Sequence, residues 1–274
     1  PNIVAAAANG QMLGLIFFGL LFGYFMTKIE HPGAATIYNF WDAIYNVMML
    51  ITDWVMKFAP IGVFALVAKV VASTGFDAFK PLALFFSSVV IALAIHFFVV
   101  MPLLLKFVAR VNPLRHYKAM APALLTAFST SSSSATLPLT LECVEKNAGV
   151  SNKTSSFVLP LGATINMDGT ALYECVAAMF IAQAYGLDLG FVEQFTIVMV
   201  ALLTSIGVAG IPAASLVAIS IILATIGLPI EGIGLILAVD RVLDMCRTTV
   251  NVFSDSCGAV IIGKSEGEEN ILKA

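Results

Sequence analysis

The chain has 274 residues, of which 59% are hydrophobic and 11% are charged, whereas an average globular domain has about a quarter charged residues. Its net charge is −3, so it has no basic surface for nucleic acid, and that class of function is excluded. The apolar stretches are long and lack the period-two alternation of a membrane barrel. They predict an all-α integral membrane protein with several spanning helices.

The first part of the chain predicts three helices. Apolar segments at 11–26, 43–72 and 82–108 carry them, with a kink or break in the second beside Pro60. His96 lies inside the third segment. We interpret it as a hydrogen-bonded packing residue, because a lone histidine in an apolar run is more often that than a proton relay.

Residues 119–141 have the length of one span but a polar centre. Residues 129–136 are almost entirely serine and threonine, and Pro138 follows them. Each apolar flank is too short to cross a hydrocarbon layer of about 30 Å, which predicts a re-entrant hairpin. A flexible serine-rich linker is the alternative.

The segment 157–185 is also of membrane length, but Asn166, Asp168 and Gly169 interrupt it. These residues are poor helix formers at such a depth, so we expect an unwound turn there. Its exposed carbonyl groups, beside carboxylates, would supply the oxygen ligands that sodium needs. Glu174 is a further buried carboxyl candidate, able to carry a proton if it has no ion-pair partner.

A second broken segment, 191–226, is too long for one span and is interrupted at 204–215. Residues 209–212 resemble residues 135–138 of the first hairpin. Broken apolar segments in matching halves of a chain are typical of the binding site of a secondary transporter. The arrangement of basic loop residues places the first hairpin on the cytoplasmic side and the second on the outside.

The last helix, expected at 233–262, carries a polar stripe on an otherwise apolar surface. At about 100° per residue the stripe falls within one arc. Ionisable side chains at membrane depth cost several kcal/mol each, so they are retained mainly where they face a protein-lined cavity and meet partners. The stripe therefore indicates a binding surface made of Asp240, Asp244, Arg247, Thr248, Asn251 and Asp255.

These motifs, taken in order, resemble the sodium-coupled glutamate/aspartate transporter family. The resemblance rests on the serine-rich tip at 131–134, on 166–170, on 205–212 and on 244–255. It covers essentially all of this chain but only about the C-terminal two-thirds of a family member, so we expect the N-terminal helices to be missing. The implied fold has two re-entrant helical hairpins and inverted repeats. The implied domains are scaffold (trimerisation) helices at 1–80 and a transport domain at 81–274, with hairpin one (119–148), a broken helix (152–185), hairpin two (190–228) and the last helix (232–263).

The resemblance also implies roles for individual residues. Arg247 would hold the side-chain carboxylate of the substrate, which suits a guanidinium that can form two parallel hydrogen bonds, and Asp244 would accept the substrate ammonium. The other implied substrate contacts are Ser132, Ser133, Thr170, Gly210, Ile211, Thr248 and Asn251. Glu174 matches the glutamate that carries the coupled proton in animal members.

For sodium, the resemblance implies three sets of ligands. One ion would lie among Gly162, Asn166, Asn251 and Asp255, a second among Thr164, Met167, Ser205, Ile206 and Val208, and Asn166 and Asp168 would contribute to a third. The chain departs from the family at Ser131 and Met245, the positions at which archaeal and animal members respectively carry an additional arginine. That departure leaves potassium countertransport and the rate of gating open.

The expected function is secondary symport, not enzyme catalysis. Sodium would drive L-glutamate or L-aspartate into the cell, with a coupled proton, by elevator-type alternating access. We expect a multi-pass homotrimer in the lipid bilayer of the plasma or inner membrane.

The alternatives within the same fold are a cation-coupled C4-dicarboxylate carrier and a neutral amino acid carrier. A dicarboxylate would leave Asp244 without an ammonium partner, which argues against the first. An aspartyl protease built on Asp168, Asp244 and Asp255, or a serine protease at Ser132, has no matching motif or neighbouring histidine in the sequence. Two gates of opposite sidedness argue against a purely conductive channel.

Overall fold

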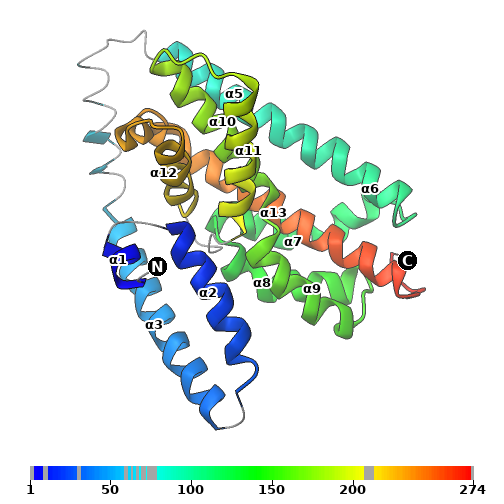
Figure 1. Cartoon of the computed structure of the whole chain (residues 1–274). Helices are drawn as coiled ribbons and strands as arrows, with labels where there is room; N and C mark the ends of the chain where they lie inside the picture. The colour runs from blue at the N-terminus through cyan, green and yellow to red at the C-terminus, as the bar shows by residue number, and fades with distance from the viewer. Residues whose placement is uncertain are drawn as a thin grey trace. The chain divides into compact units, whose positions relative to one another are not determined.

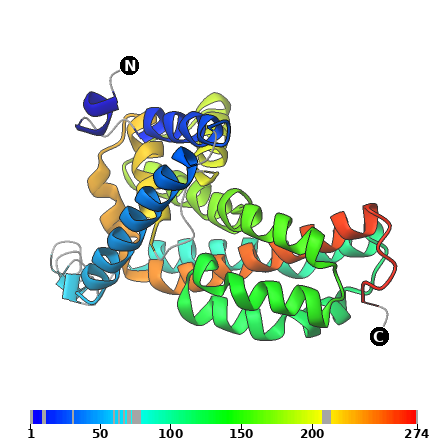
Figure 2. The same ribbon diagram turned by 90° about the horizontal axis from the view of Figure 1, so that it is seen from below.

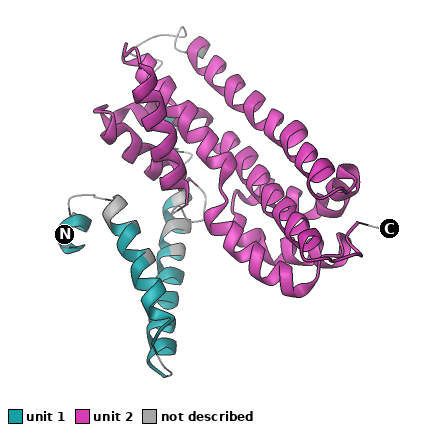
Figure 3. Ribbon diagram, turned by 45° about the vertical axis from the view of Figure 1, so that its right-hand side comes forward, with its two compact units in different colours: residues 1–69 teal, residues 70–274 magenta. Residues whose placement is uncertain are grey.

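The computed structural model describes residues 3–8, 12–29, 32–58, 61–62, 64–65, 68, 72, 79–206 and 213–272. These residues form helices and connecting turns, and none of them lies in a strand. The chain divides into two compact units, Pro1–Lys69 and Val70–Ala274 (Figure 3). The fold is therefore all-helical, as the sequence predicts.

The first unit contains α1 (Ile3–Ala8), α2 (Met12–Met26) and α3 (Gly33–Met56). The helix predicted at 11–26 corresponds to α2. The helix predicted at 43–72 overlaps α3 in its first part. The turn between α2 and α3 contains Pro32 directly before the first residue of α3, a position where proline cannot continue the preceding helix. α3 starts ten residues before the predicted helix, because its amphipathic first turns are less apolar than the segment on which the prediction rested.

The second unit begins with a long apolar helix. α5 (Phe79–Ile95), a π-helical turn (His96–Val100) and α6 (Met101–Phe107) follow one another without a break. Within the described part of the chain, Lys80–Phe107 is the helical stretch whose length and hydropathy suffice to cross a bilayer. It corresponds to the helix predicted at 82–108.

Two helices and a two-residue turn form the segment predicted as hairpin one. α7 (Pro113–Thr130) and α8 (Ser133–Glu142) pack on each other, and a π-helical turn (Cys143–Asn147) follows. α7 begins before the predicted boundary of residue 119, because the side chain of Asn112 accepts a hydrogen bond from the Leu114 N–H at 3.0 Å. It ends at Thr130, and the next residue, Ser131, has a left-handed φ of 54°, a conformation that closes helices. Ser132 then caps α8 by accepting from the Ala135 N–H at 3.2 Å.

The next segment is a helix interrupted in its middle. α9 (Asn152–Ile165) and α10 (Asp168–Ala184) are separated by Asn166 and Met167. The ψ angles of these two residues, 61° and 58°, lie far from the helical value. The interruption therefore lies inside the region where the sequence predicts an unwound turn.

Two shorter helices follow, α11 (Phe191–Ser205) and α12 (Ser215–Thr225). Residues 207–212, which include the predicted contacts Val208, Gly210 and Ile211, lie outside the described residues. A 3₁₀ turn (Ile230–Leu235) leads into α13 (Leu237–Ser265).

α13 runs through the middle of the second unit (Figures 1 and 2). It contacts α5 and α6 on one side and α7, α8 and α9 on the other, and it also contacts α10. Its buried residues Phe253 and Val260 belong to one apolar cluster with Met120 of α7, and Leu243 belongs to a second with Tyr173 of α10. Because α13 is enclosed on several sides, its polar stripe faces protein.

The residues after α13 fold back onto the start of α9. The Glu268 carboxylate accepts hydrogen bonds from Ser151 Oγ at 2.6 Å, from the Ser151 N–H at 2.7 Å and from Thr154 Oγ1 at 2.5 Å. The slight burial of Glu268 would raise its pKa, but these hydrogen bonds outweigh it and lower the pKa below its usual value. A carboxylate therefore satisfies the donors at the N-terminus of α9, where the helix dipole also favours negative charge.

Candidate functional site

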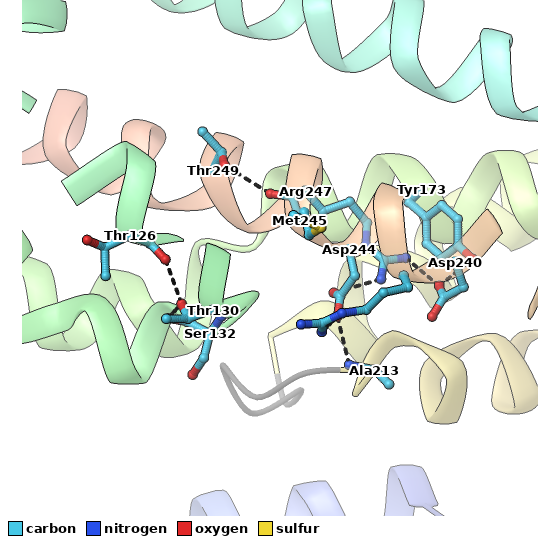
Figure 4. Close-up of polar contacts among 11 residues, drawn as sticks. Thr126, Thr130, Ser132, Tyr173, Ala213, Asp240, Asp244, Met245, Arg247 and Thr249 are labelled. Carbon is cyan, nitrogen blue, oxygen red and sulfur yellow. Dashed lines mark hydrogen bonds and ion pairs between the residues drawn. The ribbon is translucent and has the colours of Figure 1, made fainter. Parts of the chain in front are cut away.

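Arg247 is the centre of the candidate site. Its side chain is only 1% exposed, and its Nη2 donates to Asp244 Oδ1 at 2.8 Å while its Nη1 donates to Asp240 Oδ1 at 3.2 Å. The guanidinium lies over the Tyr173 ring, with Cζ 3.8 Å from the ring centroid. Figure 4 shows these side chains converging from α13 and α10. A buried arginine with two carboxylates and an aromatic face is held in one orientation by three groups.

This cluster has more negative than positive charges, and one of its hydrogen-bond donors is unused. Two carboxylates, Asp240 and Asp244, surround one guanidinium, and Tyr173 Oη donates a further hydrogen bond to Asp240 Oδ1 at 2.8 Å. The Nε–H of Arg247 has no hydrogen-bond partner among the described residues, although it is buried. An unsatisfied buried donor costs about 1–3 kcal/mol. A ligand oxygen that accepts a hydrogen bond from this Nε–H would therefore be stabilised in the site.

Asp244 also connects α13 to the second broken segment. Its Oδ2 accepts a hydrogen bond from the Ala213 N–H at 3.0 Å, a contact visible in Figure 4. Ala213 has a φ of 61°, the left-handed region that alanine rarely adopts. The predicted ammonium acceptor is thus bonded both to Arg247 and to the chain beside residues 207–212.

The tip of the first hairpin, with Thr130 and Ser132, is drawn in the same close-up as Arg247 and Asp244 (Figure 4), and α8 contacts α13. Ser131, Ser132 and Ser133 are all buried, and Ser132 caps α8. The Ser131 hydroxyl is buried without a hydrogen-bond partner in the described part of the chain. A buried hydroxyl of this kind is a donor that a ligand can satisfy.

Asn251 links α13 to the start of α10. Its Nδ2 donates to Thr170 Oγ1 at 2.9 Å, and its Oδ1 accepts from the Gly169 N–H at 2.9 Å. Thr248, one turn earlier on α13, is buried as well. The structure therefore brings the predicted substrate residues Thr170 and Asn251 into contact, on the face of α13 that also carries Arg247.

Asp255 and Asn166 form a second polar group, one helical turn beyond Asn251. Asn166 Nδ2 donates to Asp255 Oδ1 at 2.9 Å and to Ser254 Oγ at 3.0 Å. A Cβ atom at Gly162 would lie 2.5 Å from Asp255 Oδ1, so only glycine fits the backbone this close to the carboxylate. Three of the four residues predicted for the first sodium set thus lie together, while Asn251 is bonded to Thr170 instead.

A cavity of about 390 Å³ adjoins this group. Residues of α6, α9 and α13 line it together with the first residue of α10, and most of its lining is apolar. Its polar wall is formed by Gly162, Asn166, Asp168, Ser254 and Asp255. The predicted sodium ligands therefore face a space large enough for an ion with water.

Asp168 has a partner that the sequence did not suggest. Its Oδ2 lies 2.5 Å from His96 Nε2 on the π-helical turn, and its Oδ1 accepts from the Gly169 N–H at 3.0 Å. The His96 side chain is 21% exposed. The expectation that His96 is hydrogen-bonded agrees with this contact, but its partner is a predicted sodium ligand 72 residues away.

The residues predicted for the second sodium are not brought together by any described contact. Thr164 is exposed, and its hydroxyl donates to the Leu161 carbonyl of its own helix at 2.8 Å. Met167 and Ser205 are buried, while Ile206 is 40% exposed. In the described residues, no hydrogen bond joins Thr164 or Met167 to the end of α11.

Glu174 is fully buried on α10 and faces α11. Its Oε2 lies 3.2 Å from Thr204 Oγ1, and its Oε1 has no partner among the described residues. Sequence reasoning placed Glu174 at this depth but missed Thr204. It also missed Tyr173 and Ser254, which carry no signal beyond their positions beside Thr170, Glu174 and Asp255.

Comparison with known proteins adds independent findings. A family model described as the sodium:dicarboxylate symporter family matches residues 1–265. Excitatory amino acid transporter 3 of Homo sapiens is 45% identical over 270 residues, which are 98% of this chain and 51% of that protein. Excitatory amino acid transporter 1 of Mus musculus is 45% identical over 262 residues, which are 94% of this chain and 48% of that protein. The chain spans about half the length of these curated relatives.

Proposed function

Because the chain belongs to the sodium:dicarboxylate symporter family, we propose that it forms part of a symporter that carries L-glutamate or L-aspartate into the cell with sodium. The names of the excitatory amino acid transporters, which are about 45% identical to it, support this substrate class. The protein is then a transporter, not an enzyme. Sodium is cargo that drives uptake and is not a resident cofactor.

The pairing of Arg247 is the observation that carries the proposal. A substrate carboxylate that reaches the guanidinium can bind through the free Nε–H and Nη2, which displaces Asp244 from Nη2. The Asp244 carboxylate then faces the substrate ammonium, while Asp240 stays on Nη1. An acidic amino acid thus exchanges one ion pair for two, which compensates for its removal from water.

Asp244 also distinguishes the acidic amino acid from the alternatives. A C4-dicarboxylate would displace Asp244 from Arg247 and leave that carboxylate buried without a cation, at a cost of several kcal/mol. A neutral amino acid would pair with Asp244 but leave the Arg247 Nε–H unsatisfied. We therefore expect succinate to compete poorly with labelled L-aspartate for uptake.

Sodium would bind at the group formed by Gly162, Asn166 and Asp255. The carboxylate and amide oxygens there are of the kind that hard cations select, and the close approach of Gly162 keeps its backbone beside the carboxylate. Asp168 would contribute to a further ion together with Asn166. We propose the second set, Thr164, Met167, Ser205, Ile206 and Val208, for a state in which α11 lies closer to the break between α9 and α10.

We propose that the protein is a multi-pass protein of the plasma or inner membrane. Lys80–Phe107 is long enough to span, whereas α11 and α12 have 15 and 11 residues and are shorter than the roughly 20 that a span requires. These two short helices support a re-entrant hairpin two, and α7 with α8 supports hairpin one. Residues 1–80 would serve as trimerisation scaffold and residues 81–274 as the moving transport domain of a homotrimer that works by an elevator-type mechanism.

The test is uptake of labelled L-aspartate into liposomes that contain the full-length protein, driven by an inward sodium gradient. Arg247→Cys should abolish aspartate uptake and leave binding of a neutral amino acid measurable. Arg241→Cys is the matched control, because this arginine lies on the same helix, is 52% exposed and approaches Asp244 only to 3.9 Å. Unchanged aspartate affinity in Arg247→Cys would remove the central role of this residue.

A further inference from the structure

The contact between Glu174 and Thr204 joins two elements of the second unit. Glu174 is fully buried on α10, and Thr204 is fully buried in the last turn of α11, one residue before Ser205. Glu174 Oε2 and Thr204 Oγ1 are 3.2 Å apart. No other hydrogen bond to the Glu174 carboxyl is formed within the described residues.

Counting hydrogens determines which group donates. A threonine hydroxyl has one hydrogen to donate and two lone pairs to accept. Thr204 Oγ1 lies 2.9 Å from the Val200 carbonyl oxygen and 3.2 Å from the Ala201 carbonyl oxygen, and both of these can only accept. If Glu174 were ionised, three acceptors would compete for one hydrogen, and a buried carboxylate would be left almost without donors.

The neutral acid resolves this competition. In a neutral Glu174 the Oε2–H could donate to Thr204 Oγ1, and Thr204 could then donate its own hydrogen to the Val200 carbonyl. The unpartnered Oε1 is then a carbonyl oxygen rather than half of a buried carboxylate, and leaving it without a donor costs much less. In this arrangement the proton would be on Oε2, because that oxygen lies within hydrogen-bond distance of an acceptor.

The charged groups around Glu174 do not supply a substitute partner. α12 contains no titratable residue, and α11 carries only Glu193, in its first turn. α5 carries only Lys80 near its start, and the 3₁₀ turn carries Glu231. Cys175 neighbours Glu174 on α10, and on α13 the nearest charge is that of Arg247, which Asp240 and Asp244 already pair.

We propose that Thr204 is the positioning residue for a proton carried by Glu174, and that this proton ties α10 to the last turn of α11. Loss of the proton forces Thr204 to turn its single hydrogen from the Val200 carbonyl toward the carboxylate, which releases the hydroxyl from its own helix. The protonation of Glu174 is thereby linked to the last turn of α11. This inference rests on the proposed symport and on the proton-carrying role expected of Glu174, to which it adds Thr204 as the residue that positions the proton.

The experiment measures sodium-driven uptake of labelled L-aspartate by the full-length protein in liposomes while the external pH is varied. Thr204→Val keeps the shape of the side chain but removes the acceptor, Thr204→Ser keeps the hydroxyl, and Glu174→Gln removes the titration. We expect Thr204→Val to move the midpoint of the pH profile to lower pH by about half to one unit, the worth of one neutral hydrogen bond. Thr204→Ser should retain the original midpoint.

The double variant separates proton coupling from packing. Glu174→Gln should give a flat pH profile, and adding Thr204→Val to it should leave the profile flat. An unmoved midpoint in Thr204→Val, a move to higher pH, or the same move in the Glu174→Gln background would overturn the proposal. A wild-type protein that takes up no L-aspartate would refute the proposed function instead.

A second measurement needs no transport. In the infrared spectrum of purified protein, the carbonyl band of protonated Glu174 is identified by its loss in Glu174→Gln. Removal of the acceptor in Thr204→Val should move this band, whereas Thr204→Ser should leave it in place. If the band has the same frequency in the unmodified protein, in Thr204→Val and in Thr204→Ser, the proposed hydrogen bond is overturned even if the symport is correct.

Discussion

Replacing Gly162 with alanine tests the proposed sodium group of Asn166 and Asp255. The added Cβ would lie 2.5 Å from Asp255 Oδ1, whereas ordinary contact begins at 3.4 Å, so the carboxylate must retreat by about 0.9 Å. That movement also breaks its 2.9 Å hydrogen bond from Asn166. The carboxylate and the amide can then no longer contact one ion in the same geometry.

The size of the effect follows from the cost of inserting a methyl group into a packed site, typically about 1–3 kcal/mol. If that strain falls on the ion-bound form, the sodium concentration for half-maximal uptake of L-aspartate should rise by about 5- to 150-fold. The assay is sodium-dependent uptake into liposomes. The sodium-induced rise in the melting temperature of the purified protein provides a second readout.

Gly258→Ala is the matched control for this change. Gly258 lines the same cavity on α13, but a Cβ atom there would meet nothing within 4 Å. It should therefore leave the sodium dependence unchanged. If Gly162→Ala and Gly258→Ala both behave like the unmodified protein, the sodium group does not lie where we propose.

Two further changes test contacts around the site and at the end of the chain. Tyr173→Phe keeps the ring over Arg247 but loses the 2.8 Å hydrogen bond to Asp240, so thermal unfolding should show a loss of about 1 kcal/mol, and no change would argue against that bond. Glu268 has a lowered pKa in the folded protein, so its contribution is complete above its unfolded pKa and is lost as the pH falls through the lower folded value. Glu268→Gln should therefore lower the melting temperature at pH 7, by the equivalent of about 1 kcal/mol or less for so exposed a group, and the difference from the unmodified protein should vanish at acidic pH. A difference that persists at acidic pH would contradict the role of the charge.

Much of the helical arrangement follows from local sequence. The polar stripe on α13, the serine-rich turn after α7 and the interruption at Asn166 are recognisable because hydrophobic length and helical period are properties of neighbouring residues. Boundaries are less well predicted when a single contact determines them. α7 begins at Pro113 because the Asn112 side chain caps it, a detail that hydropathy does not report.

Residue type and hydropathy are enough to identify the residues that are chemically out of place in an apolar chain: Arg247, Asp244, Asp255, Asp168 and Glu174. Their partners on other helices depend on how the helices pack. Arg247 lies against the Tyr173 ring, Asp168 meets His96, and Glu174 meets Thr204, each across a helix pair. The physical reason is that periodicity assigns a residue to one face of its helix, whereas the rotation and depth at which two helices pack determine which faces meet.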